Sequence, residues 1–300
     1  MKTAVQPDMF AVTAYEPPLR DNKDVMEYPF LSLQKGRRKP INFTSDDGTK
    51  FVQVDAPEQT GIATIWDWDL IVYATAHIND AIENGQKPSD WIQFPPYDAL
   101  RYMGKSTGGK DYKELVKSIR RLFKTNITTS IRLNDTEGFE GGLRWILDYR
   151  IPSKYKANAF IRALDDGEPD TGMPWAIQLA PWLYNSILRR REVLAVHPDY
   201  FKLKGGLERW LYRLARKAVP EKEAYPAWTF NMDTLHKRSG TTRPKRAFAF
   251  DIRKIAEAQD LPEYDVIISR EGRKEMVTLM HNKAKPRRLP RSVKRLFNAA

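Results

Sequence analysis

Lysine and arginine side chains recur along residues 110–124 at spacings of three and four residues. This spacing predicts a helix with cations on one face and apolar side chains, from Tyr112 to Phe123, on the other. Lysines hold phosphates, and arginines also fork onto guanine edges. Such a row indicates noncovalent binding to a nucleic-acid backbone, although a plain solvated helix face would look the same. The candidate contacts are Lys110, Lys113, Lys117, Arg120, Arg121 and Lys124.

A second basic segment at residues 241–259 has the same character. Phe248, Ile252 and Ile255 form its expected apolar side. Two basic helices, each followed by two β-prone runs, form a rarer coincidence than one, and the repetition favours DNA binding. The candidate contacts here are Thr242, Arg243, Lys245, Arg246, Arg253 and, in the turn between the last two β-prone runs, Arg273.

The elements around the first basic helix complete a known order. A short apolar segment at 97–103 and a Gly-rich turn precede the helix, and β-prone runs at 126–133 and 143–151 follow it. Helix, turn, helix and hairpin is the order of a winged helix-turn-helix, whose second helix enters the major groove.

We therefore predict an α+β fold with two tandem winged-helix domains, a flexible N-terminal tail and a basic C-terminal tail. The expected boundaries are a disordered tail at 1–24, a first domain at 25–155, a linker at 156–174, a second domain at 175–282 and a basic tail at 283–300.

Composition narrows the choice of partner and compartment. The 300 residues carry a formal net charge of +12, which favours a polyanion. There is no cysteine, which excludes disulfides and thiolate chemistry and agrees with a reducing cytoplasm. No apolar run is long enough to span a bilayer. These features predict a cytoplasmic protein without a membrane partner.

Catalytic motifs are incomplete. Gly104-Lys105-Ser106 lacks the glycine that a phosphate-binding loop needs at position 99, which is Ala. The four histidines show no spacing suited to a metal site, and Asp67 and Asp69, two apart on an expected helix, do not face each other. A spatial Ser-His-Asp triad is not excluded by sequence. We predict a binding protein that is not an enzyme and needs no metal and no cofactor.

One peptide in the expected N-terminal tail stands apart. Gln6-Pro7-Asp8-Met9-Phe10 resembles the short motif with which replication proteins dock into the bacterial sliding clamp. Gln6, Met9 and Phe10 would make the contacts, although matches of five residues also arise by chance.

Several longer strings resemble the plasmid replication initiator protein A family of proteobacteria. They are Glu27-Tyr28-Pro29-Phe30, GIATIWDWDL at 61–70, GGKDYKELVKSIRRLF at 108–123 and LERWLYRL at 207–214, within a likeness that spans about residues 25–280.

The resemblance implies an initiator that binds repeated sites, or iterons, in double-stranded DNA at a plasmid origin. It further implies opening of the adjacent duplex, recruitment of host replication proteins (helicase, initiator and sliding clamp), repression of its own promoter and formation of a homodimer. A winged-helix transcriptional regulator without a replication role is the alternative, and a DNA-processing enzyme is a third.

Overall fold

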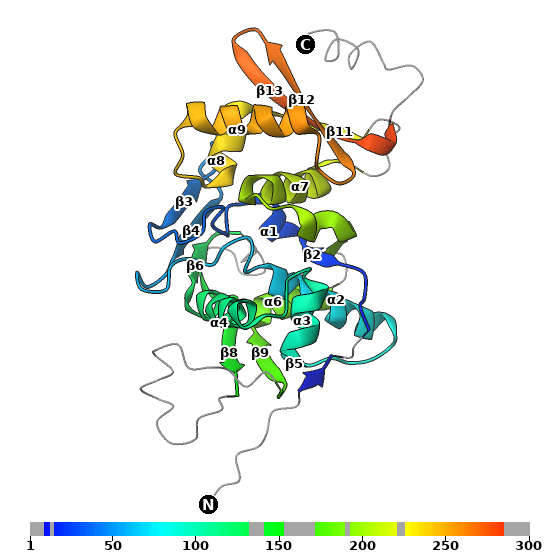
Figure 1. Ribbon diagram of the computed structural model, residues 1–300. Helices are drawn as coiled ribbons and strands as arrows, with labels where there is room; N and C mark the ends of the chain where they lie inside the picture. The colour runs from blue at the N-terminus through cyan, green and yellow to red at the C-terminus, as the bar shows by residue number, and fades with distance from the viewer. Residues whose placement is uncertain are drawn as a thin grey trace, which may run out of the picture.

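The computed structural model describes residues 9–12, 15–131, 141–152, 172–189, 193–220 and 226–284. Helices and strands are mixed along the chain, as predicted, and form two units that lie one above the other in Figure 1. One continuous apolar core runs through both units and includes Trp68, Trp145 and Trp210. No helix of the described ranges is both long enough and apolar enough to cross a membrane.

The first unit is built around α2, which is buried on nearly every side from Leu70 to Ile78. A helix that is apolar all round belongs in a core. The strands of this unit form a sheet in the order β1-β5-β9-β8, in which only β1 and β5 run parallel. The elements are β1 (Phe10–Ala11), α2 (Asp69–Glu83), β5 (Trp91–Phe94), α3 (Pro96–Tyr102), α4 (Gly109–Lys124), β8 (Ile146–Arg150) and β9 (Trp175–Leu179).

The second unit repeats this order of helix, strand, two helices and two strands. Its sheet is β11-β13-β12, so the strand that comes last in the chain again lies between the other two, as β9 does between β5 and β8. Asn231 caps α8 by accepting a hydrogen bond from the Thr234 amide at 2.7 Å, and Gly240 ends α8 with φ of +59°. The elements are α7 (Gly206–Ala218), β11 (Ala227–Asn231), α8 (Met232–Ser239), α9 (Lys245–Ala258), β12 (Tyr264–Glu271) and β13 (Lys274–His281).

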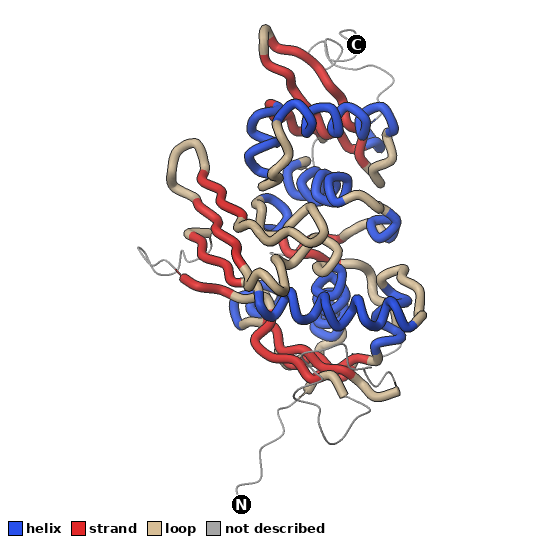
Figure 2. Tube along the Cα trace, turned by 60° about the vertical axis from the view of Figure 1, so that its left-hand side comes forward, coloured by secondary structure: helices blue, strands red, loops and turns tan. Residues whose placement is uncertain are grey.

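A separate antiparallel sheet, in the order β3-β4-β6-β7, lies on the flank of the molecule (Figure 2). Its members come from two distant parts of the chain, and Val54 of β4 stands opposite Ile127 of β6. The elements are β3 (Ile41–Thr44), β4 (Phe51–Asp55), β6 (Asn126–Thr129) and β7 (Gly141–Leu143).

The hairpin expected after the first basic helix forms only in part. β6 pairs with β7, with Ile127 opposite Leu143, but both strands belong to the flanking sheet. Most of the run at 143–151 forms β8, which pairs with β9 and closes the first unit, so this run does not form the expected wing with the run at 126–133. Strand pairing depends on packing between segments far apart in sequence, and an apolar run does not show which partner it will meet.

The boundary expected at 156–174 also differs from the structure. β8 precedes it and β9 follows it, yet Tyr149 and Ile177 are paired in one sheet. The segment connects two strands of the first unit, and its residues 153–171 lie outside the described ranges. After β9 come α6 (Pro181–Leu188), β10 (Val193–Ala195) and the 3-10 helix η1 (Pro198–Lys202).

The N-terminal tail expected at 1–24 includes an ordered strand. β2 (Arg20–Asn22) pairs with β10, and the side chains of Asp21 and Asn22 are buried. β2 leads into α1 (Lys23–Glu27), which packs against α7. At the other end, η2 (Asn282–Ala284) follows β13, and residues 285–300 of the expected basic tail lie outside the described ranges.

Buried ion pairs join the two units. The carboxylate of Asp21 accepts hydrogen bonds from Arg213 of α7 at 2.6 Å and from the Trp68 indole at 2.7 Å. Asp69, at the start of α2, accepts from Arg209 of α7 at 2.6 Å. Burial raises the pKa of Asp69, and the charges of Lys105 and Arg209 act in the opposite direction.

Candidate nucleic-acid interface

α4 has the two faces that its sequence predicts. Leu115, Ile119 and Leu122 are buried against the core, each at most 4% exposed. The lysines of the opposite face are exposed, and Lys117 forms an ion pair with Glu114 at 3.1 Å. These exposed lysines are Lys110, Lys113, Lys117 and Lys124.

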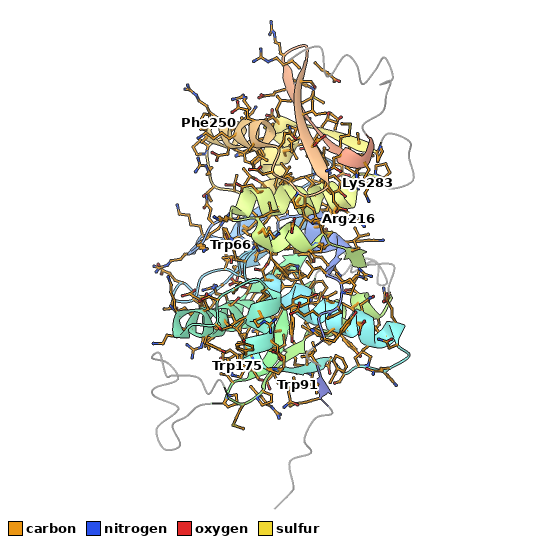
Figure 3. All side chains as sticks on the ribbon, turned by 45° about the vertical axis from the view of Figure 1, so that its right-hand side comes forward. Trp66, Trp91, Trp175, Arg216, Phe250 and Lys283 are labelled. Atoms are coloured by element: carbon orange, nitrogen blue, oxygen red, sulfur yellow. The ribbon has the colours of Figure 1, made fainter. Side chains whose placement is uncertain are left out.

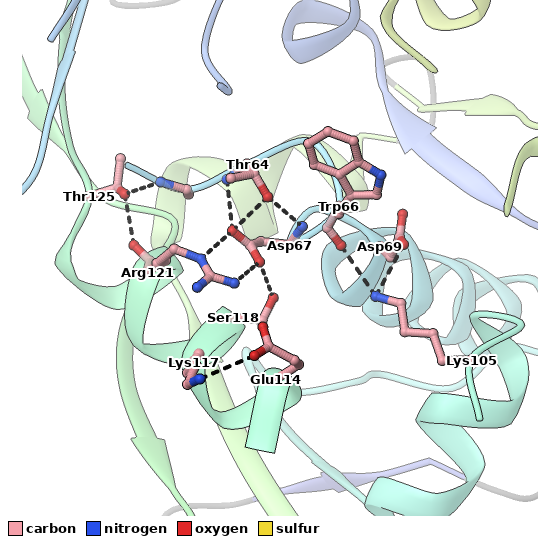
Figure 4. A network of polar contacts seen from close by, with 11 residues as sticks. Thr64, Trp66, Asp67, Asp69, Lys105, Glu114, Lys117, Ser118, Arg121 and Thr125 are labelled. Carbon is pink, nitrogen blue, oxygen red and sulfur yellow. Dashed lines mark hydrogen bonds and ion pairs between the residues drawn. The ribbon is translucent and has the colours of Figure 1, made fainter. Parts of the chain in front are cut away.

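Arg121 does not belong to that exposed row. Its guanidinium forms two hydrogen bonds with the carboxylate of Asp67, at 2.8 and 2.7 Å (Figure 4). Burial alone would lower the pKa of Arg121, but the hydrogen bond and charge of Asp67 outweigh it and raise the pKa. The guanidinium therefore fixes α4 in the fold and is not available to DNA. Arg120 is half-buried and also has interactions within the protein.

Both carboxylate oxygens of Asp67 accept hydrogen bonds within this network. It also accepts hydrogen bonds from Ser118 of α4 at 2.7 Å and from the Thr64 amide at 2.7 Å. Because the segment of Asp67 leads directly into α2, the network ties α4 to the central helix of the first unit. The orientation of the lysine row thus depends on a carboxylate 54 residues away from Arg121.

The exposed cations of α4 are lysines, whereas α9 exposes two arginines, Arg246 and Arg253, beside Lys245 and Lys254. Arg246 is exposed in the first turn of α9, Arg273 is exposed in the β12–β13 turn, and Lys274 is exposed at the start of β13. Between α8, α9 and this turn lies a groove of about 650 Å³ that both Arg246 and Arg273 line. The described part of the chain thus brings Arg246, Arg253, Arg273 and Lys245 around one groove.

Other cations of this groove are paired with carboxylates. Arg253 holds Glu275 of β13 through two hydrogen bonds of 2.7 Å, and the hydrogen bond to Glu275 raises the pKa of Arg253. Lys245 pairs with Asp233 of α8. Lys237 of α8 pairs with Asp46 of the β3–β4 turn at 2.5 Å. The two lysine pairs are exposed and weak, so a DNA phosphate can compete with the carboxylates for these lysines. The Arg253–Glu275 pair is held by two hydrogen bonds to a largely buried carboxylate and is the firmer one.

The turn between α8 and α9 touches the segment that enters the flanking sheet. The Thr242 hydroxyl donates a hydrogen bond to the side chain of Gln34 at 3.2 Å, and Arg37 donates to the Gly240 carbonyl at 2.5 Å. Arg243 pairs with Asp251 of α9 at 3.0 Å. Thr242 and Arg243 therefore set the position of α9 through contacts within the protein.

The junction of the units requires a glycine. At Gly206, the first residue of α7, a Cβ atom would lie 2.4 Å from the Leu33 carbonyl oxygen and 2.9 Å from the Trp66 ring. No larger residue fits between these groups without displacing the backbone. α7 therefore packs directly on the first unit, and this contact fixes α9 relative to α4.

The expected clamp-binding peptide is partly built into the fold. Phe10 lies in β1 opposite Ile92 and is half-buried against the core. An aromatic side chain in this position is not free to fill a pocket on another protein. Met9 is half-buried, and Gln6 lies outside the described residues.

Carboxylates and histidines are scattered in the described ranges, which contain no group of three or more that could hold a metal ion. Asp67 and Asp69, considered above as a metal pair, face different partners: Arg121 for Asp67, and Arg209 with Lys105 for Asp69. Both carboxylates thus have structural partners.

A family model described as Replication initiator protein A matches residues 20–266. The chain belongs to the replication initiator protein A family. It is similar to a Wigglesworthia glossinidia brevipalpis protein named as a candidate replication protein, with 26% identity over 242 residues, 80% of this chain and 82% of the relative.

Solved structures add a likeness of fold for this chain. Two crystal structures of domains 2 and 3 of RctB match it with TM-scores of 0.58 and 0.55. Each alignment covers 84% of this chain and 94% of the solved chain, at 15% identity. The likeness covers both units described above and concerns the fold alone.

The interpretation of the sequence missed two features of the interface. One is Asp67, whose pairing with Arg121 depends on three-dimensional proximity. The other is Phe250 of α9, which is 53% exposed although the chain around it is strongly patterned. The helical period could have found Phe250, because it falls opposite Phe248, Ile252 and Ile255.

Proposed function

We propose that this chain is a plasmid replication initiator that binds repeated sites in double-stranded DNA at its origin. α4 and α9 act as the recognition helices of two winged-helix units. The observation that carries the proposal is the repetition of one topology, with a cationic outer face on the corresponding helix in each copy. Membership of the replication initiator protein A family supports it.

Each unit has a distinct part in binding. The lysines of α4, chiefly Lys110, Lys113 and Lys117, anchor phosphates and contribute little to sequence preference. Arg246 of α9 and Arg273 of the β12–β13 turn reach base edges or the adjacent backbone. Recognition helices in successive major-groove faces lie about 34 Å apart, so one chain covers roughly 20 base pairs.

Later steps of initiation form part of the same proposal. Binding promotes opening of the adjacent duplex and brings the host helicase and host initiator to the origin. A homodimer represses the gene's own promoter. The protein works in the cytoplasm as a binding protein without catalytic activity. The sliding clamp is not included, because Phe10 is held in β1.

A footprint across the replicon that carries this gene tests the proposal. We expect protection of several repeats, each about 20 base pairs long, outside a single promoter operator. Equal affinity for the replicon and for random DNA would refute site-specific binding. Protection of one operator only, with plasmid maintenance unaffected by deletion of the gene, would instead identify a transcriptional regulator. Nicking of supercoiled plasmid in Mg²⁺ would identify a DNA-processing enzyme.

A further inference from the structure

Phe250 is a large apolar side chain on the solvent face of α9. Its side chain is 53% exposed, whereas Phe248, Ile252 and Ile255 of the same helix are at most 8% exposed. Figure 3 shows Phe250 on α9, away from the layer where α7 packs. Exposing an aromatic ring forgoes the free energy of its burial, so a partner that covers it would gain stability from the contact.

The direction of Phe250 follows from helix geometry. Successive residues are about 100° apart, so Phe250 lies about 200° from Phe248 and faces away from the core. Arg246, Arg253 and Lys254 lie one turn away on either side and are exposed. The Lys254 ammonium lies 4.7 Å from the centre of the Phe250 ring. The ring is therefore the apolar centre of a cationic surface.

An exposed aromatic ring surrounded by cations indicates which kind of partner can cover it. An apolar pocket on another protein would have to bury Arg246 and Lys254 together with the ring, which is costly without matching anions. The DNA major groove supplies both features, because phosphates form its rims and the 5-methyl group of thymine projects from its floor. Apolar side chains on recognition helices contact this methyl group.

We propose that Phe250 packs on the 5-methyl group of a thymine and thereby determines sequence preference in the second unit. The inference rests on the proposed function and specifies one base-edge contact of it. Phe250 lies in the second turn of α9, within the part of a recognition helix that approaches the bases. The exposed Glu257 lies near the C-terminal end of α9, where a helix entering by its N-terminal part leaves the groove.

The corresponding face of α4 has no such group. Lys117 lies at the centre of its outer face, and the neighbouring Lys113 and Lys124 are also cations. A lysine surface holds phosphates without distinguishing bases. Thymine recognition is accordingly assigned to α9 and not to α4.

Replacing thymine by uracil removes only the methyl group and tests the contact directly. One replicon fragment is amplified with dTTP or with dUTP, and its affinity for the full-length protein is titrated at a fixed salt concentration. Burial of one methyl group corresponds to a factor of about four in affinity. We expect the wild-type protein to bind the thymine fragment at least about fourfold more tightly than the uracil fragment.

Variants separate Phe250 from other effects of the base change. Phe250→Ala is expected to lower the thymine-to-uracil affinity ratio by about fourfold, and Phe250→Leu to lower it less. Trp228→Ala is the matched control, because Trp228 is a 50% exposed aromatic residue on β11 of the same unit. It should keep the wild-type ratio. An effect of uracil on DNA shape changes the affinity ratio of the wild type and of Phe250→Ala alike, so it cancels when the two ratios are compared.

Other results would overturn the inference in distinguishable ways. The thymine contact would be refuted by the same thymine-to-uracil affinity ratio in wild type and Phe250→Ala. If both proteins still preferred the replicon over an unrelated fragment, the proposed function would stand. If the wild type showed no preference for the replicon, both the thymine contact and the proposed function would be refuted. Equal binding of both fragments, together with Phe250-dependent binding to phosphatidylserine vesicles, would assign the surface to a membrane instead.

Discussion

Two basic residues on one helix face can have different functions when only one of them meets a carboxylate. On α4, Arg121 is bound to Asp67, whereas Lys117, one turn earlier, is exposed and has only a surface partner, Glu114. Both follow the same period in the sequence. The position of Asp67 decides between them, and no local pattern reports it.

The different roles of Arg121 and Lys117 can be measured through the free energy of unfolding. Arg121→Ala leaves the buried Asp67 without its guanidinium partner and should lower the free energy of unfolding by about 2–3 kcal/mol, somewhat less than for a fully buried pair. Lys117→Ala should change it by less than about 0.5 kcal/mol. Urea unfolding followed by tryptophan fluorescence gives both values. Equal effects of the two substitutions would contradict the assignment of Arg121 to the fold.

A buried histidine makes stability depend on pH. His77 of α2 packs on Tyr73 and Tyr102, and burial lowers its pKa from 6.5 to about 4. The unfolded chain therefore binds a proton between these values that the folded chain does not, so stability is lost as pH falls through this window. The loss attributable to His77 should reach about 2–3 kcal/mol near pH 4.

His77→Phe removes this titration and keeps an aromatic ring at the site. Unfolding free energies of the wild type and the variant, measured from pH 7 down to pH 4, should therefore differ increasingly as the pH falls. Because Asp69 and other carboxylates titrate in both proteins, their contribution cancels in the difference. Parallel curves would show that His77 has an ordinary pKa.

At the scale of elements, α4 and α9 should differ in how they depend on salt and sequence. Lys113→Ala should weaken binding to all DNA alike and reduce the slope of log affinity against log salt by about one unit. Arg246→Ala should relax preference at one base pair, by about 1–3 kcal/mol. Titrations against replicon and random fragments at several salt concentrations measure both. A uniform loss for Arg246→Ala would show a phosphate contact in place of a base contact.

Element prediction from sequence succeeded where the signal was local. The periods of α4 and α9 gave their buried faces, and Gly272 in the β12–β13 turn, with φ of +60°, agrees with the expected hairpin. The prediction of strand pairing failed where the partner strand was remote in the sequence. β9 has the apolar composition of a buried strand, but its neighbours β5 and β8 could not be read from it. The exposed cations of α4 and α9 were thus predicted in part, and the ion pairs and strands that support these helices were not.

At the scale of the whole molecule, residues near the N-terminus belong to the junction. Asp21 is the buried partner of Arg213, so a chain that begins at residue 25 leaves this guanidinium, only 2% exposed, without its carboxylate. We expect a loss of about 3–5 kcal/mol relative to a chain that begins at residue 9. Thermal and urea unfolding of the two chains measure the difference. Equal midpoints would restore the interpretation of this segment as a tail.

The sheet of the first unit also bears on how the protein is made. β5 ends at Phe94, but its partner β9 ends at Leu179, and β2 has to meet β10 at Val193–Ala195. At a ribosomal rate of about 5–20 residues per second, β5 waits roughly 4–17 s for β9 to be synthesised. During that time the edge of β5 is open to other chains. Chaperones that shield nascent strands should therefore matter more for this first unit than for the second, whose strands are close together in the sequence.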